Sequence, residues 1–364
     1  MPPSLKIGIL GTRGIPNRYG GFEECAQHLA TGLVNKGHSV WAYNSHQHEY
    51  QEDTWQGVNI VHCLDPESWM GTAGQFIYDW NCITDARKRN FDIVLHLGYT
   101  SSSVWYWRWP GKSLNIVNMD GLEWKRSKYS KKVQRFLQYA EKLAALHADI
   151  LVADSPGIQS YLADKYGKKS VFIPYGAEII TEPEERGLKE NHLRRQGYYL
   201  AIARMEPENN IETIILGYLK SESKNPLVIV GNTANVYGAW LRKTYGTQNI
   251  IFPGGIYNTD IINDLRYHSL LYFHGHSVGG TNPSLLEAMG CSALIVAHNN
   301  PFNKAVLGND AFYFSDPTEV CLCINNVTDK SQYATCIENN IAKIKTIYNW
   351  PAVTDKYEEL FLRR

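Results

Sequence analysis

One repeated pattern constrains the fold of this sequence: short apolar runs alternate with longer segments of helical periodicity. In the first half of the chain, the pattern predicts strands at 5–10, 38–43, 58–63, 92–97, 114–118, 150–153 and 170–174. Helices are predicted between most of them, at 22–36, 72–89, 130–147 and 155–165. Strands that alternate with helices indicate parallel βαβ units. We therefore predict an open, doubly wound α/β domain over residues 1–180.

The pattern starts again after a polar, charged stretch at 181–197, which we interpret as a linker. Strands are predicted at 198–203, 227–231, 249–252, 270–274, 293–297 and 311–314, and helices at 209–220, 235–245, 258–267, 283–290 and 331–348. A second α/β domain therefore covers 198–349, and a helical tail follows at 350–364. Two such domains with a central crevice bind ligands at the carboxyl ends of their strands, so we expect the function to lie there.

Composition excludes several classes of protein. The 364 residues suit about two domains. Lys+Arg and Asp+Glu are both 36, so we expect no nucleic-acid partner. The seven cysteines form no C-x-x-C pair, and neither a signal peptide nor an apolar run of membrane-spanning length is evident. We expect a cytoplasmic protein with free thiols.

The first glycine-rich loop does not match a nicotinamide site. Glycines stand at 8, 11 and 14, whereas a dinucleotide loop needs G-x-G-x-x-G, and no acidic residue ends the second strand. Further along, Gly20 and Gly21 precede the helix, where backbone N–H groups could approach an anion. A plain glycine turn explains the same pair equally well.

The segment GHSVGG at 275–280 matches the G-x-S-x-G pattern of hydrolases and is the main rival hypothesis. A Ser277 nucleophile would need an acid and then a histidine after it. His298 is the one later histidine, and Glu287 is the sole acid between them. The helix also begins several residues after the serine, at Pro283, whereas a nucleophile elbow starts its helix at the serine itself.

Without the hydrolase pattern, residues 279–290 predict a seat for a diphosphate. Asn282 caps the helix, so the N–H groups of Ser284 and Leu285 are expected to point outward. Glu287 follows one turn later, where it could accept hydrogen bonds from sugar hydroxyls. An ordinary capped helix is the alternative. The candidate donor-binding residues of this stretch are Gly279, Gly280, Thr281, Asn282, Ser284, Leu285 and Glu287.

Two charged residues follow strands that we expect to end at the crevice. Arg204 ends the first strand of the second domain, where a guanidinium suits a phosphate. Asp120 lies just after the strand 114–118, where a carboxylate can act as a base or stabilise charge. A surface salt bridge and a turn aspartate beside glycine are the simpler interpretations.

A basic cluster follows Asp120. Six of the eleven residues from Lys125 to Arg135 are Lys or Arg, which favours either an anionic membrane surface or a solvated helix face. No D-x-D motif occurs, and the histidine pairs lack an evident third ligand. We therefore expect neither a metal nor another cofactor.

Four motifs in the right order give the chain a family resemblance. They are GTRGIPNRYGGFEE at 11–24, NMDGLEWKRSK at 118–128, ARMEPENN at 203–210 and HSVGGTNPSLLEAM at 276–289. The chain resembles retaining glycosyltransferases of family 4, and within them a bacterial subgroup that includes rhamnosyltransferases of polysaccharide synthesis. The resemblance implies a GT-B fold, in which the tail 350–364 crosses back onto the N-terminal domain.

The resemblance also implies roles for single residues. Glu287 matches the second glutamate of a Glu-x₇-Glu pattern, which holds the nucleotide ribose, while the first falls on Gly279. An Arg and Lys pair on the diphosphate maps to Arg204 and Asn209, and Arg13 could supply part of the lost charge. Asp120 falls at a catalytic position. The acceptor-binding residues that we expect are Tyr19, Glu123, Trp124 and Lys125.

The expected function is sugar transfer from a nucleotide donor to a lipid-linked saccharide at the inner face of the cytoplasmic membrane. The best candidate donor is dTDP-β-L-rhamnose, with a UDP- or GDP-hexose as the alternative. Two other classes stay open: the Ser277 hydrolase, and a sugar-nucleotide binder without catalysis.

Overall fold

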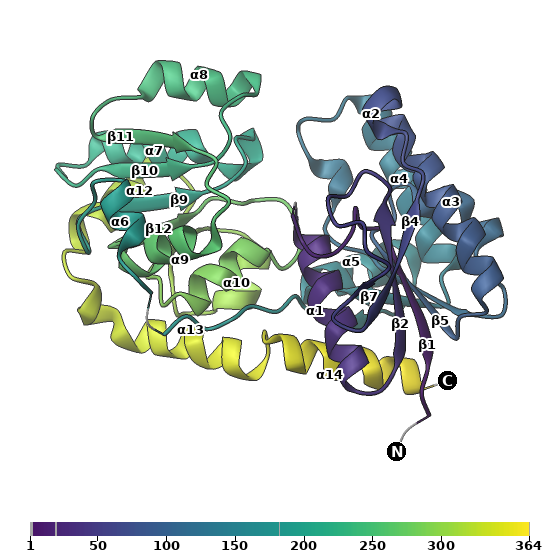
Figure 1. Ribbon diagram of the computed structural model, residues 1–364. Helices are drawn as coiled ribbons and strands as arrows, with labels where there is room; N and C mark the ends of the chain where they lie inside the picture. Colours follow the sequence, from purple (N-terminus) through teal and green to yellow (C-terminus); the bar gives the residue numbers. More distant parts are fainter. Residues whose placement is uncertain (1–2, 19, 182, 364) are drawn as a thin grey trace. The chain divides into compact units, whose positions relative to one another are not determined.

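The computed structural model describes residues 3–18, 20–181 and 183–363, and its contacts divide the chain into two compact units (Figure 1). Unit 1 consists of residues 1–124, 129–175 and 350–364. Unit 2 consists of residues 125–128 and 176–349. The loop 125–128 therefore groups by its contacts with the second unit, although the residues on both sides of it belong to the first.

Unit 1 contains one sheet. Its strands are β1 (Lys6–Leu10), β2 (Ser39–Ser45), β3 (Thr54–Trp55), β4 (Val58–Cys63), β5 (Ile93–Leu97), β6 (Leu114–Asn118), β7 (Ile150–Ala153) and β8 (Val171–Phe172). Its α-helices are α1 (Gly21–Asn35), α2 (Glu67–Met70), α3 (Gly74–Arg89), α4 (Lys131–His147), α5 (Pro156–Tyr166) and α14 (Trp350–Leu362). Short 3₁₀ helices are η1 (Gly71–Ala73), η2 (Ser102–Arg108) and η3 (Glu123–Lys125).

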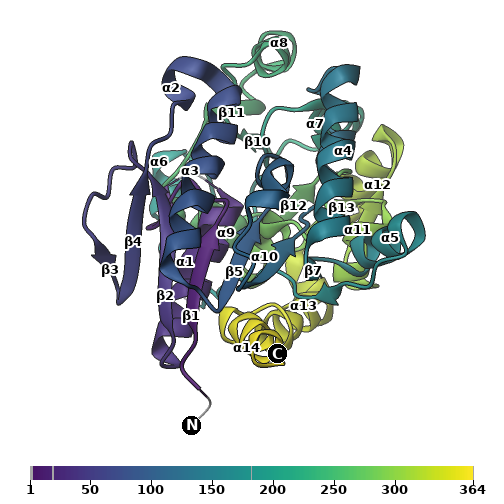
Figure 2. The ribbon, with the colours of Figure 1, turned by 90° about the vertical axis from the view of Figure 1, so that its right-hand side faces the viewer.

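The described strands of unit 1 form an eight-stranded sheet in the order β3-β4-β2-β1-β5-β6-β7-β8. All pairs are parallel except β3 with β4. The helices α1 and α3 lie on opposite faces of this sheet (Figures 1 and 2). Because both faces are covered, β5 is buried at all five positions, as a central parallel strand requires.

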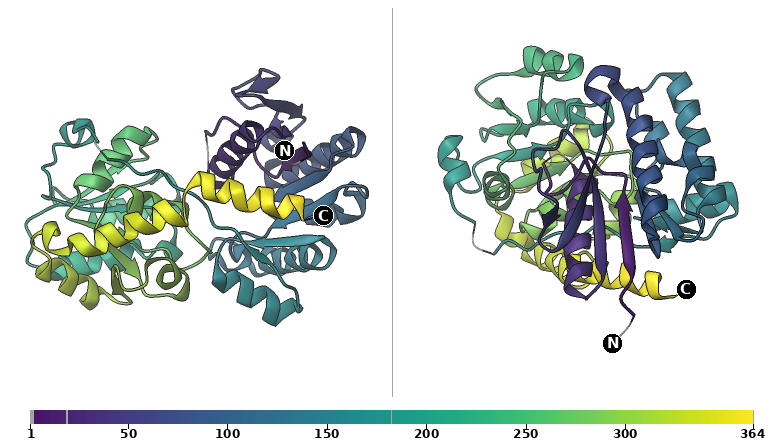
Figure 3. Two further views of the ribbon diagram at one scale, coloured as in Figure 1. Left: turned by 90° about the horizontal axis from the view of Figure 1, so that it is seen from below. Right: turned by 45° about the vertical axis from the view of Figure 1, so that its right-hand side comes forward.

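The C-terminal helix α14 completes unit 1. It lies beside α1, where the Trp350 ring stacks on His28 with the centroids 4.5 Å apart (Figure 3). Gly32 of α1 allows this close approach, since a Cβ there would lie 2.7 Å from the Thr354 Oγ1 atom. The tail thus packs on the N-terminal unit, as the family resemblance implies.

Unit 2 has its own sheet. Its strands are β9 (Tyr199–Ile202), β10 (Leu227–Val230), β11 (Ile250–Gly254), β12 (Leu271–His274), β13 (Ile295–His298) and β14 (Phe312–Phe314). Its α-helices are α6 (Arg186–Glu190), α7 (Ile211–Lys220), α8 (Val236–Tyr245), α9 (Thr259–His268), α10 (Pro283–Gly290), α11 (Pro301–Leu307), α12 (Pro317–Asn326) and α13 (Ala334–Thr346). Two 3₁₀ helices are η4 (Pro207–Asn209) and η5 (Lys330–Tyr333).

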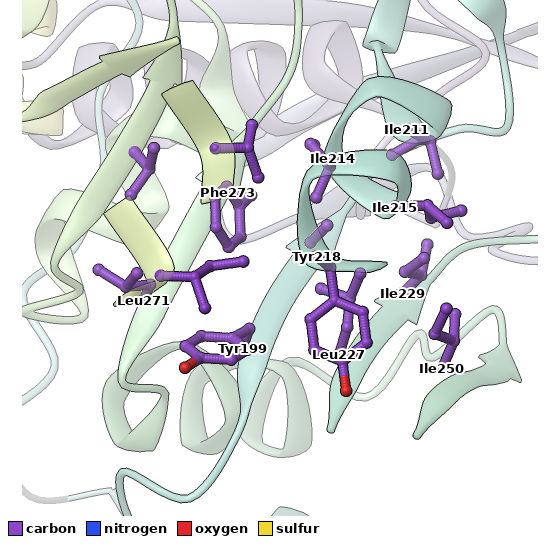
Figure 4. Packing of buried hydrophobic residues seen from close by; sticks show 14 of the residues in the cluster. Tyr199, Ile211, Ile214, Ile215, Tyr218, Leu227, Ile229, Ile250, Leu271 and Phe273 are labelled. Carbon is purple, nitrogen blue, oxygen red and sulfur yellow. The ribbon is translucent and has the colours of Figure 1, made fainter. Parts of the chain in front are cut away.

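The described strands of unit 2 form a six-stranded parallel sheet in the order β11-β10-β9-β12-β13-β14. Its core places Leu227, Ile229 and Phe273 of the strands against α7, which contributes Ile214 and Ile215 (Figure 4). The prediction of two doubly wound α/β sheets is therefore confirmed.

The structure differs from the expected linker at 181–197. Within the described part of this stretch, α6 forms and groups with unit 2. The Gly187 N–H donates to the Asp264 carboxylate of α9 at 2.9 Å, and Leu188 is buried. The charged composition of the stretch did not predict that α6 packs on unit 2, because the packing depends on one glycine and one leucine. The helix α12 was also missed, although Asp316 and Pro317 give the usual start signals of a helix.

We expect Gly217→Ala to destabilise the protein by about 1–3 kcal/mol, because a Cβ at Gly217 would lie 2.4 Å from the Val320 Cβ of α12. Alanine otherwise favours a helix over glycine by about 1 kcal/mol, so a net loss must come from packing. Thermal unfolding measures it. Gly111→Ala is the control, since nothing lies within 4 Å of a Cβ there. Equal melting temperatures for both variants would contradict the close α7–α12 contact.

Candidate functional site

The strand order of unit 2 reverses between β9 and β12, which are paired in parallel through Ala201 and Phe273. The loops that follow these two strands therefore leave the sheet side by side. In doubly wound sheets, ligands bind outside the carboxyl ends of the strands at this switch point. Arg204 follows β9, and the stretch 275–282 follows β12, so the structure brings the predicted donor-binding segments of unit 2 to one place.

Arg204 is exposed, whereas Asn209 is buried. The Asn209 side-chain N–H donates to the Arg204 carbonyl at 2.8 Å, so this amide closes the turn that carries the guanidinium. We expected Asn209 to touch the donor in place of a lysine. In the structure, the Asn209 side-chain N–H stabilises the Arg204 loop.

Among the described residues, the Ser277 hydroxyl is not hydrogen-bonded to a base. Its hydroxyl donates to the Glu208 carbonyl at 2.8 Å, and its N–H donates to the same oxygen at 3.0 Å. The helix α10 begins at Pro283, not at the serine. A nucleophilic serine needs its hydroxyl hydrogen-bonded to a base. The geometry therefore contradicts the hydrolase hypothesis.

The start of α10 corrects one expectation about the diphosphate seat. The Ser284 N–H donates to Asn282 Oδ1 at 3.0 Å, and the Leu285 N–H donates to the Asn282 carbonyl at 3.0 Å. Both groups were expected to point outward, but the capping asparagine uses them. In the loop before the helix, Gly279 adopts a φ of +136°, which favours glycine. No atom of the described residues lies within 4 Å of the position that a Cβ would take there. A glutamate at that position would strain the backbone, whereas glycine adopts it freely.

Thr281 and Gly280 complete this loop; Thr281 is buried, and Gly280 is half-buried. These two residues therefore lie between the open turn at Gly279 and the cap at Asn282.

Glu287 pairs with a residue that sequence reasoning missed. Its carboxylate accepts a hydrogen bond from Arg266 of α9, and Arg266 also donates to Ser284 Oγ at 3.2 Å. Glu287 is 42% exposed, whereas the Arg266 side chain is only 4% exposed. Burial disfavours the charge on Arg266, but the Glu287 carboxylate, together with Tyr272 and Cys291, raises the pKa of the arginine above its ordinary value. The fixed guanidinium orients the carboxylate, whose other oxygen has no hydrogen-bond partner among the described residues.

In unit 1, the structure corrects the expected role of Arg13. Its guanidinium bonds to Asp65 at 3.2 Å and also to Glu67, while its backbone N–H donates to Glu23 at 2.8 Å. Two carboxylates already balance its charge. The Arg13 guanidinium is therefore paired with carboxylates within unit 1, which leaves less of its charge for a diphosphate.

Gly20 caps α1, and Gly21 begins it. The Gly20 N–H donates to Asn17 Oδ1 at 3.2 Å. Glu23 and Glu24 lie in the first turn of the helix, where carboxylates interact favourably with the helix dipole. Because these charges repel an anion, the arrangement favours the glycine turn over the phosphate seat.

Asp120 lies two residues after β6 and is held in an uncommon backbone conformation, with a φ of +47°. Its N–H donates to Asn118 Oδ1 at 3.0 Å, and Tyr175 donates to its carboxylate at 3.4 Å. Asn118 in turn donates to the Tyr357 hydroxyl of α14 at 3.1 Å. Burial, followed by the charge of Asp120, raises the pKa of Tyr175, which keeps this donor protonated. The C-terminal helix thus fixes the loop that carries the candidate catalytic carboxylate.

Of the expected acceptor-binding residues, Tyr19 lies outside the described residues. Glu123, Trp124 and Lys125 form η3, and none of the three is buried. The Tyr129 hydroxyl donates to Glu123 at 3.5 Å. By its contacts, Lys125 groups with unit 2, and the other two residues group with unit 1.

A buried carboxylate holds Trp124 in place. Glu141 of α4 is 1% exposed and accepts the Trp124 indole N–H at 3.1 Å. It also accepts hydrogen bonds from the hydroxyls of Tyr161 and Tyr166, both at 2.6 Å, and forms an ion pair with Lys165 at 2.9 Å. Burial, together with the hydrogen bond to Glu141, raises the pKa of Tyr161. No sequence signal pointed to this cluster, because its members lie on three separate elements.

Comparisons with known proteins agree with this geometry. Residues 5–178 match the family described as "Domain of unknown function (DUF1972)", and residues 184–329 match the family described as "Glycosyl transferases group 1". The chain is similar to a sucrose-phosphate synthase from Thermosynechococcus elongatus, with a TM-score of 0.82, 15% identity and 98% of each chain covered. The fold is GT-B.

Two further proteins are similar to the chain. The Anabaena protein HepE, solved in complex with UDP-glucose, has a TM-score of 0.76 and 14% identity, with 97% of this chain and 98% of that chain covered. An uncharacterised glycosyltransferase from Methanocaldococcus jannaschii is 23% identical over 316 residues, 78% of each chain. Together, the matches support a GT-B glycosyltransferase.

Glu287→Gln is expected to weaken binding of UDP, which has two ribose hydroxyls, and of dTDP, which has one, more than binding of the same nucleotides without these hydroxyls. The amide keeps the shape of the carboxylate but has one acceptor oxygen. Calorimetric titration with both ligands measures the difference, and Glu338→Gln, at an exposed position in α13, is the control. If the substitution lowers the affinity for both ligands equally, the role of Glu287 is limited to its ion pair with Arg266.

Proposed function

We propose that this protein transfers a sugar, with retention of the anomeric configuration, from a nucleotide diphosphate donor to a lipid-linked saccharide. One observation carries the proposal: Arg204 and Glu287 lie in segments that the switch point of unit 2 brings together. An exposed guanidinium suits the diphosphate, and a half-exposed, fixed carboxylate suits the ribose hydroxyls. The complex of HepE with UDP-glucose supports a nucleotide-sugar donor.

In this proposal the chemistry depends on the leaving group. Arg204 stabilises the negative charge that develops on the departing diphosphate, which is the largest kind of catalytic contribution. Asp120 in unit 1 supplies a fixed carboxylate for the acceptor hydroxyl or for the developing positive charge on the sugar. Trp124, whose indole is held by Glu141, gives the acceptor sugar an apolar ring to stack on.

For the donor, we propose dTDP-β-L-rhamnose. The support is the sequence resemblance at 11–24, 118–128, 203–210 and 276–289 to rhamnosyltransferases of polysaccharide synthesis. A UDP- or GDP-hexose is the alternative donor.

A donor screen by thermal shift tests the proposal on the full chain. At a hundredfold excess over Kd, a ligand stabilises the folded state by about 2.7 kcal/mol, so dTDP-rhamnose should give the largest shift. Arg204→Ala should reduce that shift, since a hydrogen bond to a charged group contributes about 1.5–3 kcal/mol. Because the sequence has no D-x-D motif, we expect the shift to survive EDTA.

The outcomes separate the alternatives. A larger shift with a UDP- or GDP-sugar identifies the other donor, and no shift with any of them contradicts nucleotide binding. Binding without transfer to a lipid-linked saccharide identifies a binder without catalysis. For a product that does form, the anomeric coupling in its NMR spectrum reports retention or inversion.

We also propose that α4 brings the protein to an anionic membrane. Lys131, Lys132 and Arg135 are exposed in its first turns. In the same turns, Val133 is 39% exposed and Phe136 is 37% exposed. Exposed apolar and basic side chains on one helix are typical of contact with the membrane interface. No helix within the described residues is long and apolar enough to cross a bilayer.

Replacing Lys128, Lys131 and Lys132 with Glu should abolish sedimentation with anionic vesicles. Each basic residue near such a surface contributes on the order of 1 kcal/mol, and salt screens it over about 8 Å. The control replaces Lys220, Lys224 and Lys243 of unit 2, which are exposed and change the charge equally. Equal binding by both variants, or binding to neutral lipids as well, would reduce the basic cluster to a solvated helix face.

A further inference from the structure

Arg204 and His276 follow the two strands that meet at the switch point of unit 2. The parallel register of β9 with β12 pairs Tyr199 with Leu271, Leu200 with Tyr272 and Ala201 with Phe273. Arg204 comes two residues after the end of β9, and His276 comes two residues after the end of β12. The two side chains also interact electrostatically, since the positive charge of Arg204 lowers the pKa of the His276 imidazole.

The structure holds the His276 ring in a fixed place. The ring stacks on His274, with centroids 4.3 Å apart and planes 16° apart. The His276 carbonyl accepts from Asn300 at 3.0 Å and from Asn303 at 3.1 Å. The next residue, Ser277, is bound to Glu208 through both its N–H and its hydroxyl. A ring held on this many sides is preorganised, so little entropy is lost when it binds a ligand.

The hydrogen-bonding capacity of this ring is unused. Nδ1 is buried and has no partner among the described residues. Nε2 makes no hydrogen bond to a described residue either. The residue as a whole is partly exposed. Buried polar groups in native proteins usually have a partner, and Nδ1 lacks one. Nε2 is free of described protein partners, so its hydrogen bond can go to a ligand.

The charge state of His276 selects the kind of ligand. Burial, and after it the charge of Arg204, lowers the pKa of His276 to about 3. The ring is therefore neutral near pH 7 and carries its proton on one nitrogen. A proton on Nε2 is the one that a ligand could accept. An acceptor beside an exposed guanidinium is an anionic oxygen, such as a phosphate oxygen.

Resting on the proposed nucleotide-sugar transfer, we propose that His276 is a donor ligand that hydrogen-bonds the diphosphate through Nε2–H, next to Arg204. This contact replaces part of the interaction lost at Asn209 and Gly279, where the family pattern has a lysine and a glutamate. The amide of Asn209 is committed to the Arg204 carbonyl, and Gly279 has no side chain.

Amide substitutions test which nitrogen acts. Glutamine places an N–H near the position of Nε2, asparagine places one near Nδ1, and phenylalanine has neither. Titration calorimetry with dTDP and with UDP on the full chain should show His276→Gln within about threefold of the wild-type Kd. His276→Asn and His276→Phe should each bind about tenfold or more weakly, as expected for one lost charge-assisted hydrogen bond. His62→Phe in β4 is the control.

The affinities of the three His276 variants decide whether His276 binds the nucleotide. Wild-type affinity in all three His276 variants overturns the inference and leaves the proposed function standing. Equal losses in all three, with a lower melting temperature, assign His276 to packing on His274 and also overturn it. If neither nucleotide binds the wild type, the failure lies in the proposed function, and the inference falls with it.

Discussion

The pairing of neighbouring parallel strands at each switch point is the constraint on which the candidate site depends. In unit 2, the register of β9 with β12 places Arg204 beside the loop 275–282. In unit 1, β1 and β5 make the same junction, where a Cβ at Gly11 would lie 2.2 Å from the Leu97 carbonyl. Only glycine fits that approach, and its φ of +95° also favours glycine. Backbone packing therefore fixes the loops before any side chain is considered.

Charge is then divided unequally between the two units. Around Arg13, carboxylates from Asp65 and Glu67 satisfy the guanidinium, and the nearby Asp79 is buried deeply enough that its pKa is raised to about 6. At the corresponding edge of unit 2, Arg204 is exposed, and the histidine beside it is neutral. An anion is therefore favoured at this edge of unit 2 more than beside Arg13 in unit 1. This difference agrees with a nucleotide diphosphate bound by unit 2.

Several candidate site residues were predictable from their position in the sequence, next to the end of a strand or the start of a helix. Asp120 and Arg204 directly follow apolar strands, and Glu287 follows a capped helix start, so the sequence places them at the carboxyl edge of a sheet. Predictions that depended on partners were less successful. The Ser284 N–H was expected to be open, but the cap at Asn282 uses it. Arg13 was expected to face a phosphate, but carboxylates 52 and 54 positions later along the chain bind it, and a local pattern does not show them.

The sequence by itself determined the two doubly wound sheets and the order of the motifs, because hydrophobic periodicity and glycine placement are local properties. It also determined the helical tail, whose apolar spacing is visible without a partner. Only the tertiary structure decided which charged side chains have a partner within the protein and which stay available to a ligand. Arg266 became a support for Glu287, and Glu141 became a support for Trp124, because burial brings together residues from separate elements. A buried charge needs a partner, and the chain fold decides which residue provides it.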